Sequence, residues 1–115
     1  MAKIGKYTIK SVSKEKMVAG KGKSLHYIGG NPEAEKKLKS LKKVYKQAHV
    51  PTGDIIVRKG LNKKQRSETI KHEYEEAEAI KIKHESYPKA HRRAERDETM
   101  PMSKIKAKVA RMKKK

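Results

Sequence analysis

Hydrophobic and polar residues alternate with a period of two near the start of the chain and with helical spacing over most of the rest. Residues 6–12 alternate, as expected for a strand with one buried face. Residues 16–28 fit a β-hairpin with its glycine-rich turn at 20–23. A β-branched run at 54–58 predicts a further strand. We expect these strands to form a small antiparallel sheet.

Three later segments carry the apolar stripe of a helix. The first covers residues 32–48, where Asn31 supplies a capping side chain and Pro32 suits the first turn. The second runs over about 63–84, and the third over 87–98. The pattern therefore predicts an α+β fold with about three helices and a helix-rich C-terminal half.

The chain is short enough for one domain, which we place at residues 1–98 with a helical hairpin at 60–98. Residues 99–115 follow as a basic C-terminal tail. Within this tail, residues 103–115 fit a short basic helix with apolar side chains on one side. They fit equally well an arm that is disordered until it binds a partner.

Charge changes the picture more than any other property of the composition. The net charge is +19, with 26 lysines against 6 arginines, and the chain has no cysteine, phenylalanine or tryptophan. Nine of the thirteen acidic residues fall in residues 60–98, so the hairpin is chemically distinct from its basic flanks. The large positive charge opposes compaction, and a polyanion would relieve that repulsion.

We therefore predict association with nucleic acid, DNA or RNA, mainly through phosphate electrostatics with little sequence preference. A virion or ribonucleoprotein component fits this interpretation. The N-terminus lacks the apolar centre of a signal peptide, and no apolar run is long enough to cross a membrane, so we expect a cytoplasmic, nucleoid or virion location. The residues expected to contact nucleic acid are Lys21, Lys23, Lys36, Lys39, Lys43, Lys104, Lys106, Lys108, Arg111, Lys113, Lys114 and Lys115.

The acidic hairpin also contains a pattern typical of metal sites. His72 and Glu76 are four residues apart, so on a helix both side chains lie on one face and can bind one ion. Glu73 projects beside that face, where it could act as a general base. If the hairpin is antiparallel, His91 faces the pair, giving two imidazoles and a carboxylate with one open coordination position.

This part of the chain resembles the zincin metallopeptidases. The resemblance lies in the strand Ile55–Val57, the turn Lys59–Asn62 and the helix segment Arg66–Glu73, which look like the edge strand and the active-site helix of that family. It implies a zinc site with His72, Glu76 and His91 as ligands and Glu73 as the catalytic base. Glu76 stands where the zincin motif His-Glu-x-x-His has its second histidine.

The same region is similar to small proteins of phages and archaeal mobile elements. In these proteins His-Glu-x-x-Glu is followed by Tyr-x-x-Ala-His-x-x-Ala-x-x-Glu. The matching residues here, with a shortening before the last, are Tyr87, Ala90, His91, Ala94 and Glu95. The resemblance implies a compact zinc metallohydrolase or an inactive relative.

A simpler interpretation of the hairpin remains open. Its acidic residues could balance lysines and arginines across two packed helices, in exposed ion pairs worth a few tenths of a kcal/mol each. Whether the protein is an enzyme therefore stays undecided at this point. The other three histidines, His26, His49 and His84, are expected at the surface or at helix ends and not as metal ligands.

Overall fold

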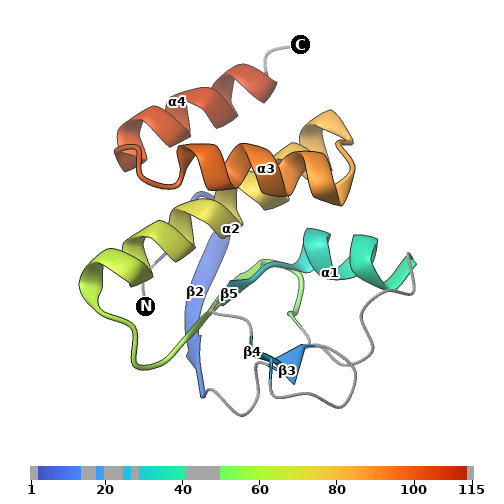
Figure 1. Ribbon diagram of the computed structural model, residues 1–115. Helices are drawn as coiled ribbons and strands as arrows, with labels where there is room; N and C mark the ends of the chain where they lie inside the picture. Colours follow the sequence, from blue (N-terminus) through green and yellow to red (C-terminus); the bar gives the residue numbers. More distant parts are fainter. Residues whose placement is uncertain (1–2, 14–17, 20–24, 27–28, 41–49, 114–115) are drawn as a thin grey trace.

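The computed structural model describes residues 3–13, 18–19, 25–26, 29–40 and 50–113. Its main sheet has four strands in the order β1-β2-β6-β5, formed by Lys3–Ile4, Tyr7–Val12, Asp54–Arg58 and Gly29–Gly30 (Figure 1). The helices lie together to one side of this sheet. The predicted α+β class is confirmed.

The sheet is mixed, and the prediction of an antiparallel sheet is wrong in this respect. Strands β2 and β6 run parallel, with Ile9 opposite Ile55, whereas β1 pairs with β2 and β5 pairs with β6 in antiparallel fashion. Strand β6 is therefore internal, which explains its β-branched composition because both of its faces are covered. The edge-strand role that the zincin resemblance gives to Ile55–Val57 is not met, since β5 forms that end of the sheet.

The predicted hairpin is present in its described part. Strands β3 (Val18–Ala19) and β4 (Leu25–His26) pair antiparallel, with Val18 opposite His26. The expected turn, with Lys21 and Lys23, lies outside the described residues. Helix α1 is described over Pro32–Ser40, and the remainder of the predicted helix to residue 48, including Lys43, also lies outside them, as does His49.

Helix α2 spans Lys63–Lys83, close to the predicted range. It begins with a capping box in which the Asn62 side chain accepts a hydrogen bond from the Gln65 backbone at 2.8 Å and the Gln65 side chain accepts one from the Asn62 backbone. It ends at His84, whose φ of 54° is left-handed, so the prediction that His84 marks a helix end is confirmed.

Helix α3 covers Tyr87–Asp97 after the capping residue Ser86, and α4 covers Met102–Lys113. Of the two alternatives for the C-terminal segment, the described residues form the helix. Its apolar side chains are buried, so α4 belongs to the packed body of the protein (Figure 1).

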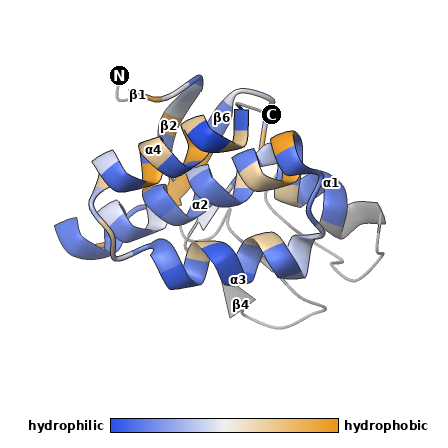
Figure 2. Ribbon diagram, turned by 90° about the horizontal axis from the view of Figure 1, so that it is seen from above, coloured by the Kyte–Doolittle hydropathy of each residue, from blue (hydrophilic) through white to orange (hydrophobic). Residues whose placement is uncertain are grey.

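The main core lies between the sheet, α2 and α4. Ile55 and Val57 of β6 point into it and are fully buried, together with Ile105 and Val109 of α4. A second cluster joins the four helices through small residues such as Ala79 and Ala90, and a third lies on the other side of β6, where Ile56 packs against Val50 and Val12. Seen from above, α2, α3 and α4 consist mostly of hydrophilic residues (Figure 2). None of the helices that the structure describes has the length and apolarity to cross a bilayer.

Candidate metal centre

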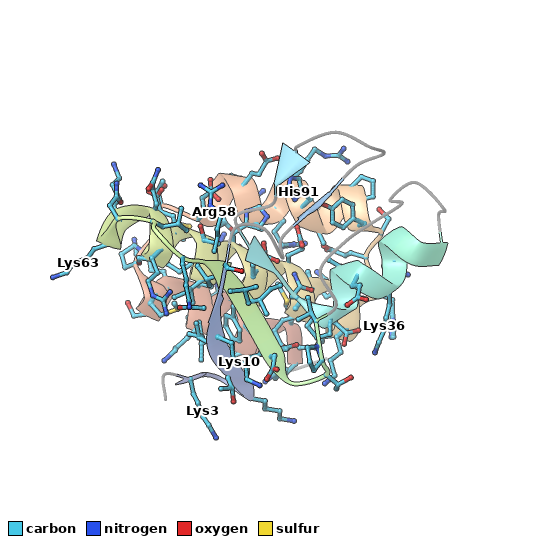
Figure 3. The ribbon with its side chains drawn as sticks, turned by 90° about the horizontal axis from the view of Figure 1, so that it is seen from below. Lys3, Lys10, Lys36, Arg58, Lys63 and His91 are labelled. Atoms are coloured by element: carbon cyan, nitrogen blue, oxygen red, sulfur yellow. The ribbon has the colours of Figure 1, made fainter. Side chains whose placement is uncertain are left out.

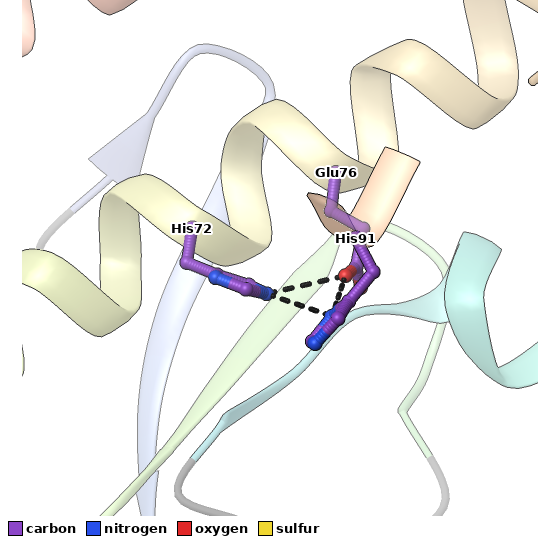
Figure 4. A group of neighbouring side chains, drawn as sticks. All are labelled: His72, Glu76 and His91. Carbon is purple, nitrogen blue, oxygen red and sulfur yellow. Dashed lines mark hydrogen bonds and ion pairs between the residues drawn. The ribbon is translucent and has the colours of Figure 1, made fainter. Parts of the chain in front are cut away.

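Helices α2 and α3 bring together the three side chains that the sequence singles out as metal ligands. The Nε2 atom of His72 lies 3.2 Å from Oε2 of Glu76, and the Nδ1 atom of His91 lies 2.8 Å from the same oxygen. The two imidazole nitrogens are 3.2 Å apart, so the three atoms form a compact triangle (Figure 4). The expected meeting of His91 with the i, i+4 pair is thus found.

The dimensions of this triangle fit one tetrahedral metal ion. Zinc bonds to nitrogen and oxygen ligands at about 2.0–2.1 Å, so neighbouring ligand atoms in a tetrahedron lie about 3.3 Å apart. The three separations here are 2.8–3.2 Å, slightly shorter than that edge. An ion at the triangle would need only small outward movements of the ligands and would leave a fourth position for another molecule.

Each candidate ligand is held from behind by a second group. The Nδ1 atom of His72 lies 3.0 Å from Oε2 of Glu98, an arrangement that orients an imidazole and strengthens it as a ligand. The other oxygen of Glu76 accepts a hydrogen bond of 3.0 Å from Asn31. The His91 ring is stacked on Tyr87, with ring centres 5.3 Å apart. The ligands are therefore positioned before any ion binds.

Glu73 occupies a buried position beside the triangle. The Asn31 side chain donates a hydrogen bond of 2.6 Å to Glu73, so one amide group joins Glu73 and Glu76. Strand β5 passes close by, and a β-carbon at Gly29 would lie 2.5 Å from the Thr69 side chain, so this approach needs glycine. Burial and the charge of Glu76 raise the pKa of Glu73 to about 8.

The ligands themselves also have shifted proton affinities. Burial alone would lower the pKa of His72, but hydrogen bonding to Glu76 and the nearby carboxylates outweigh it and raise the pKa to about 9. Hydrogen bonding to Glu76 likewise raises the pKa of His91. For Glu76 burial acts upward, yet its bonds to both histidines hold its pKa below the usual value. The histidines of the cluster thus favour their protonated forms, and a bound cation would displace those protons.

Access to the centre is from the His91 side. The side chains of His72 and Glu76 are 10% and 3% exposed, whereas those of His91 and Glu98 are 37% and 33% exposed. The second predicted pair, His91 and Glu95, is weaker, with 3.6 Å between Nε2 and the carboxylate. Glu95 therefore lies at the rim and outside the triangle.

The simpler interpretation of the hairpin requires its acids to form exposed ion pairs with its lysines and arginines. Its central carboxylates have other partners. Glu76 contacts the two histidines and Asn31, and Glu78 accepts a hydrogen bond of 3.0 Å from the Tyr7 hydroxyl. Lys71 instead donates to the carbonyl of Met100 at 2.8 Å. The central part of the hairpin is thus a buried polar site, and not the solvated charged surface that this interpretation assumes.

The residues predicted to contact nucleic acid are dispersed. Lys104, Lys106, Arg111 and Lys113 are exposed on α4. Lys36 and Lys113 lie 3.7 and 3.6 Å from Glu33 and Glu78, and Lys108 pairs with the buried Asp97 at 2.9 Å. The side chain of Lys39, and all of Lys114 and Lys115, lie outside the description.

The sequence interpretation did not assign roles to Asn31 and Glu98 at the metal centre. Asn31 is 42 residues from Glu73 in the chain and was noted only as a helix cap, a role it also has, since it accepts from the Ala34 backbone at 2.9 Å. Glu98 follows His91 by two turns of helix, and this i, i+7 spacing could have suggested that both belong to one face.

Comparisons of the chain with protein-family models, with curated proteins and with solved structures found no match. The site therefore has to be judged on its own geometry and chemistry.

Proposed function

We propose that the protein binds zinc through His72, Glu76 and His91 and acts as a zincin-like hydrolase. The observation that carries this proposal is the triangle of two imidazole nitrogens and one carboxylate oxygen with separations of 2.8–3.2 Å. Two histidines and one glutamate are a known ligand set of catalytic zinc, with the fourth position open to water or substrate.

The donor set favours zinc over the other common ions. Magnesium and calcium prefer all-oxygen sites with six or more ligands, whereas this centre offers two nitrogens and one carboxylate oxygen. Its small size suits four-coordinate zinc. Copper and nickel also accept imidazole, but they favour square-planar or tetragonal sites over a tetrahedral one.

The protein's own groups suggest a division of labour in hydrolysis. When bound, zinc would supply a Lewis acid that polarises the bond to be cleaved. Glu73 is the candidate general base, which would take a proton from the attacking water and return it to the leaving group, because it lies buried beside the triangle and shares the Asn31 amide with Glu76. Asn31 is a positioning residue, because its amide holds Glu73 against Glu76. A peptide bond is the substrate that the zincin resemblance implies.

Replacement of the base separates catalysis from metal binding. We expect zinc-loaded protein to cleave fluorescently labelled casein, and Glu73→Gln to lose that activity by at least about a hundredfold while keeping its zinc. Glu95→Gln, at the rim of the same site, is the matched control and should retain activity. Zinc binding without cleavage by the unmodified protein would leave an inactive, structural zinc site, and equal activity in Glu73→Gln would refute the assigned role.

Association with nucleic acid is a second candidate function. The net charge of +19 supports it, and so do two surface hollows lined by basic side chains, which the next subsection describes. The metal centre and the nucleic-acid surface would then be separate parts of one protein.

A further inference from the structure

Two neighbouring hollows on the helical side of the protein are lined almost entirely by cations. The first lies where α2, α3 and α4 meet and is lined by Lys83, Arg93, Lys108, Arg111 and Met112. The second lies along α3 and is lined by Lys89, Arg92, Arg93 and Arg96. Arg93 belongs to both, so the hollows form one continuous surface, which we call the arginine face. Among the described residues, no carboxylate lines either hollow.

The choice of cation on this surface differs from that of the whole chain. The sequence uses 26 lysines and only 6 arginines, yet four of those arginines line the arginine face. A guanidinium group presents five donors in a planar fork that fits phosphate oxygens in a bidentate manner, which lysine cannot do. Solubility alone gives no reason for arginine to gather in one place.

Buried carboxylates hold several of these cations in position. Arg93 donates to the buried Glu85 through Nε at 3.1 Å and through a second nitrogen. Asp97, also buried, accepts from Lys108 at 2.9 Å and from Arg96 at 3.0 Å. Each arginine keeps further donors for a ligand. Side chains fixed in this way lose less conformational entropy on binding than free ones.

Cations elsewhere among the described residues have a different setting. A third hollow, between α1 and α2, contains Glu33 among its lysines. Lys10 pairs with Asp54 at 3.0 Å on the sheet. Figure 3 shows Lys3, Lys36, Arg58 and Lys63 on separate elements. The arginine face is thus distinguished by concentration and by anchoring, and not by positive charge alone.

We propose that the arginine face binds the phosphodiester backbone of nucleic acid. This inference deepens the second candidate function by naming its surface. Lys89 and Arg96 lie two helical turns apart, about 10 Å along α3, a length that corresponds to about three phosphates of one strand. A membrane surface is the less suitable partner, because among the described residues Met112 is the sole apolar side chain lining the hollows and is only 8% exposed, which offers little to insert into lipid.

The arginine face and the metal centre lie on opposite sides of α3. Lys89, Arg93 and Arg96 are separated from His91 by about 140–160° around the helix axis, and Arg92 by about 100°. A nucleic acid bound to the arginine face would therefore leave the access side of the metal centre open. Binding would localise the protein on a polyanion, and the nucleic acid would not be the substrate of the metal centre.

A charge-matched pair of variants tests the surface. The first variant removes four cations of the arginine face and keeps those that pair with buried carboxylates. Its changes are Lys83→Gln, Lys89→Gln, Arg92→Gln and Arg111→Gln. Lys3→Gln/Lys6→Gln/Lys63→Gln/Lys64→Gln removes four exposed cations elsewhere. Binding of a labelled DNA duplex, and of the RNA duplex of the same sequence, is followed by fluorescence anisotropy over a range of salt concentrations. Unfolding temperature and zinc content verify that both variants are intact.

We expect the arginine-face variant to bind at least about tenfold more weakly and to lower the salt slope on the DNA duplex by about three to four, since each lost phosphate contact removes about 0.9. The control should lose less than about threefold. Equal losses in the two variants would overturn the surface and leave nucleic-acid association standing. Failure of the unmodified protein to bind either duplex at low salt would overturn both the proposed surface and nucleic-acid association. Binding to anionic phospholipid vesicles but to neither duplex would do the same.

Discussion

The two sides of helix α3 use buried carboxylates in opposite ways. On the His91 side, Glu76 draws two imidazole nitrogens to within 3.2 Å of one oxygen and forms a centre whose inner side chains are almost hidden from solvent. On the other side, Glu85 and Asp97 lie beneath the surface and hold arginines and a lysine that remain available to solvent.

This difference separates a site that selects one ion from a surface that attracts many charges. A triangle of fixed size accepts few ligands and has a chemical consequence only if the correct ion binds. A broad anchored cationic surface binds any phosphate backbone and loses affinity as salt rises. Both depend on charges buried in a core with no phenylalanine or tryptophan, so their energetic contributions should be separable by experiment.

Removal of zinc should have the largest effect on stability. An ion that joins α2 to α3 binds only the folded chain, and at a free concentration of a thousand times its Kd it stabilises by about 4 kcal/mol. We therefore expect EDTA to lower the Tm of the zinc-loaded protein by many degrees, as measured by circular dichroism. His72→Ala and His91→Ala should no longer respond to EDTA.

The matched control for that experiment is Glu95→Gln, which removes a carboxylate next to His91 but outside the triangle. It should respond to EDTA like the unmodified protein. If all variants respond alike, the stabilising ion binds elsewhere, and the triangle on the His91 side of α3 is not a metal site.

Truncation of the α4 core should have the next largest effect. Ile105 of α4 is fully buried in the main core, so Ile105→Ala should lower the free energy of unfolding by about 3 kcal/mol in urea titration. The exposed neighbour change Lys104→Ala should cost less than about 0.5 kcal/mol. Equal small effects would mean that α4 does not belong to the folded body, and the arginine face would lose one of its three helices.

Arg93→Gln, on the arginine face, should lower the free energy of unfolding by about 2 kcal/mol at pH 7. The reason is that the buried Glu85 carboxylate then keeps no charged partner of that strength. Although burial opposes it, hydrogen bonding to Arg93 lowers the pKa of Glu85 below its ordinary 4.5. A depressed pKa stabilises the fold above the ordinary value and loses that contribution as pH falls through the folded value. The destabilisation should therefore shrink below pH 4.5 in urea titrations. Arg92→Gln, at an exposed position, is the control, and a pH-independent loss would contradict the ion pair.

The sequence predicted strand β6 and helices α2 and α3 closely, because each has a strong local signal, either the β-branched run of β6 or the apolar stripe of a helix. It did not predict that β2 and β6 pair in parallel. Strand partners are selected by contacts between residues far apart in the chain, and alternation alone carries no information about them.

The candidate ligands were predicted because helical spacing places His72 above Glu76 and the hairpin returns His91 to them. Their support by Asn31 was not predicted, since that contact joins α2 to a residue from the other half of the chain. The simpler interpretation of the hairpin let the arginines of α3 balance the acids of α2. Only the fold shows that Glu85 and Asp97 hold Arg93 and Arg96 from below, and that no carboxylate of the described residues lines the hollow along α3.

The number of zinc ions bound per chain tests most directly whether His72, Glu76 and His91 form a zinc site. Protein reconstituted with zinc and freed of excess metal would be measured by inductively coupled plasma mass spectrometry. We expect one zinc per chain in the unmodified protein and in Glu73→Gln, and almost none in His72→Ala or His91→Ala. Absence of zinc from the unmodified protein after reconstitution, or equal zinc in the histidine variants, would contradict this expectation.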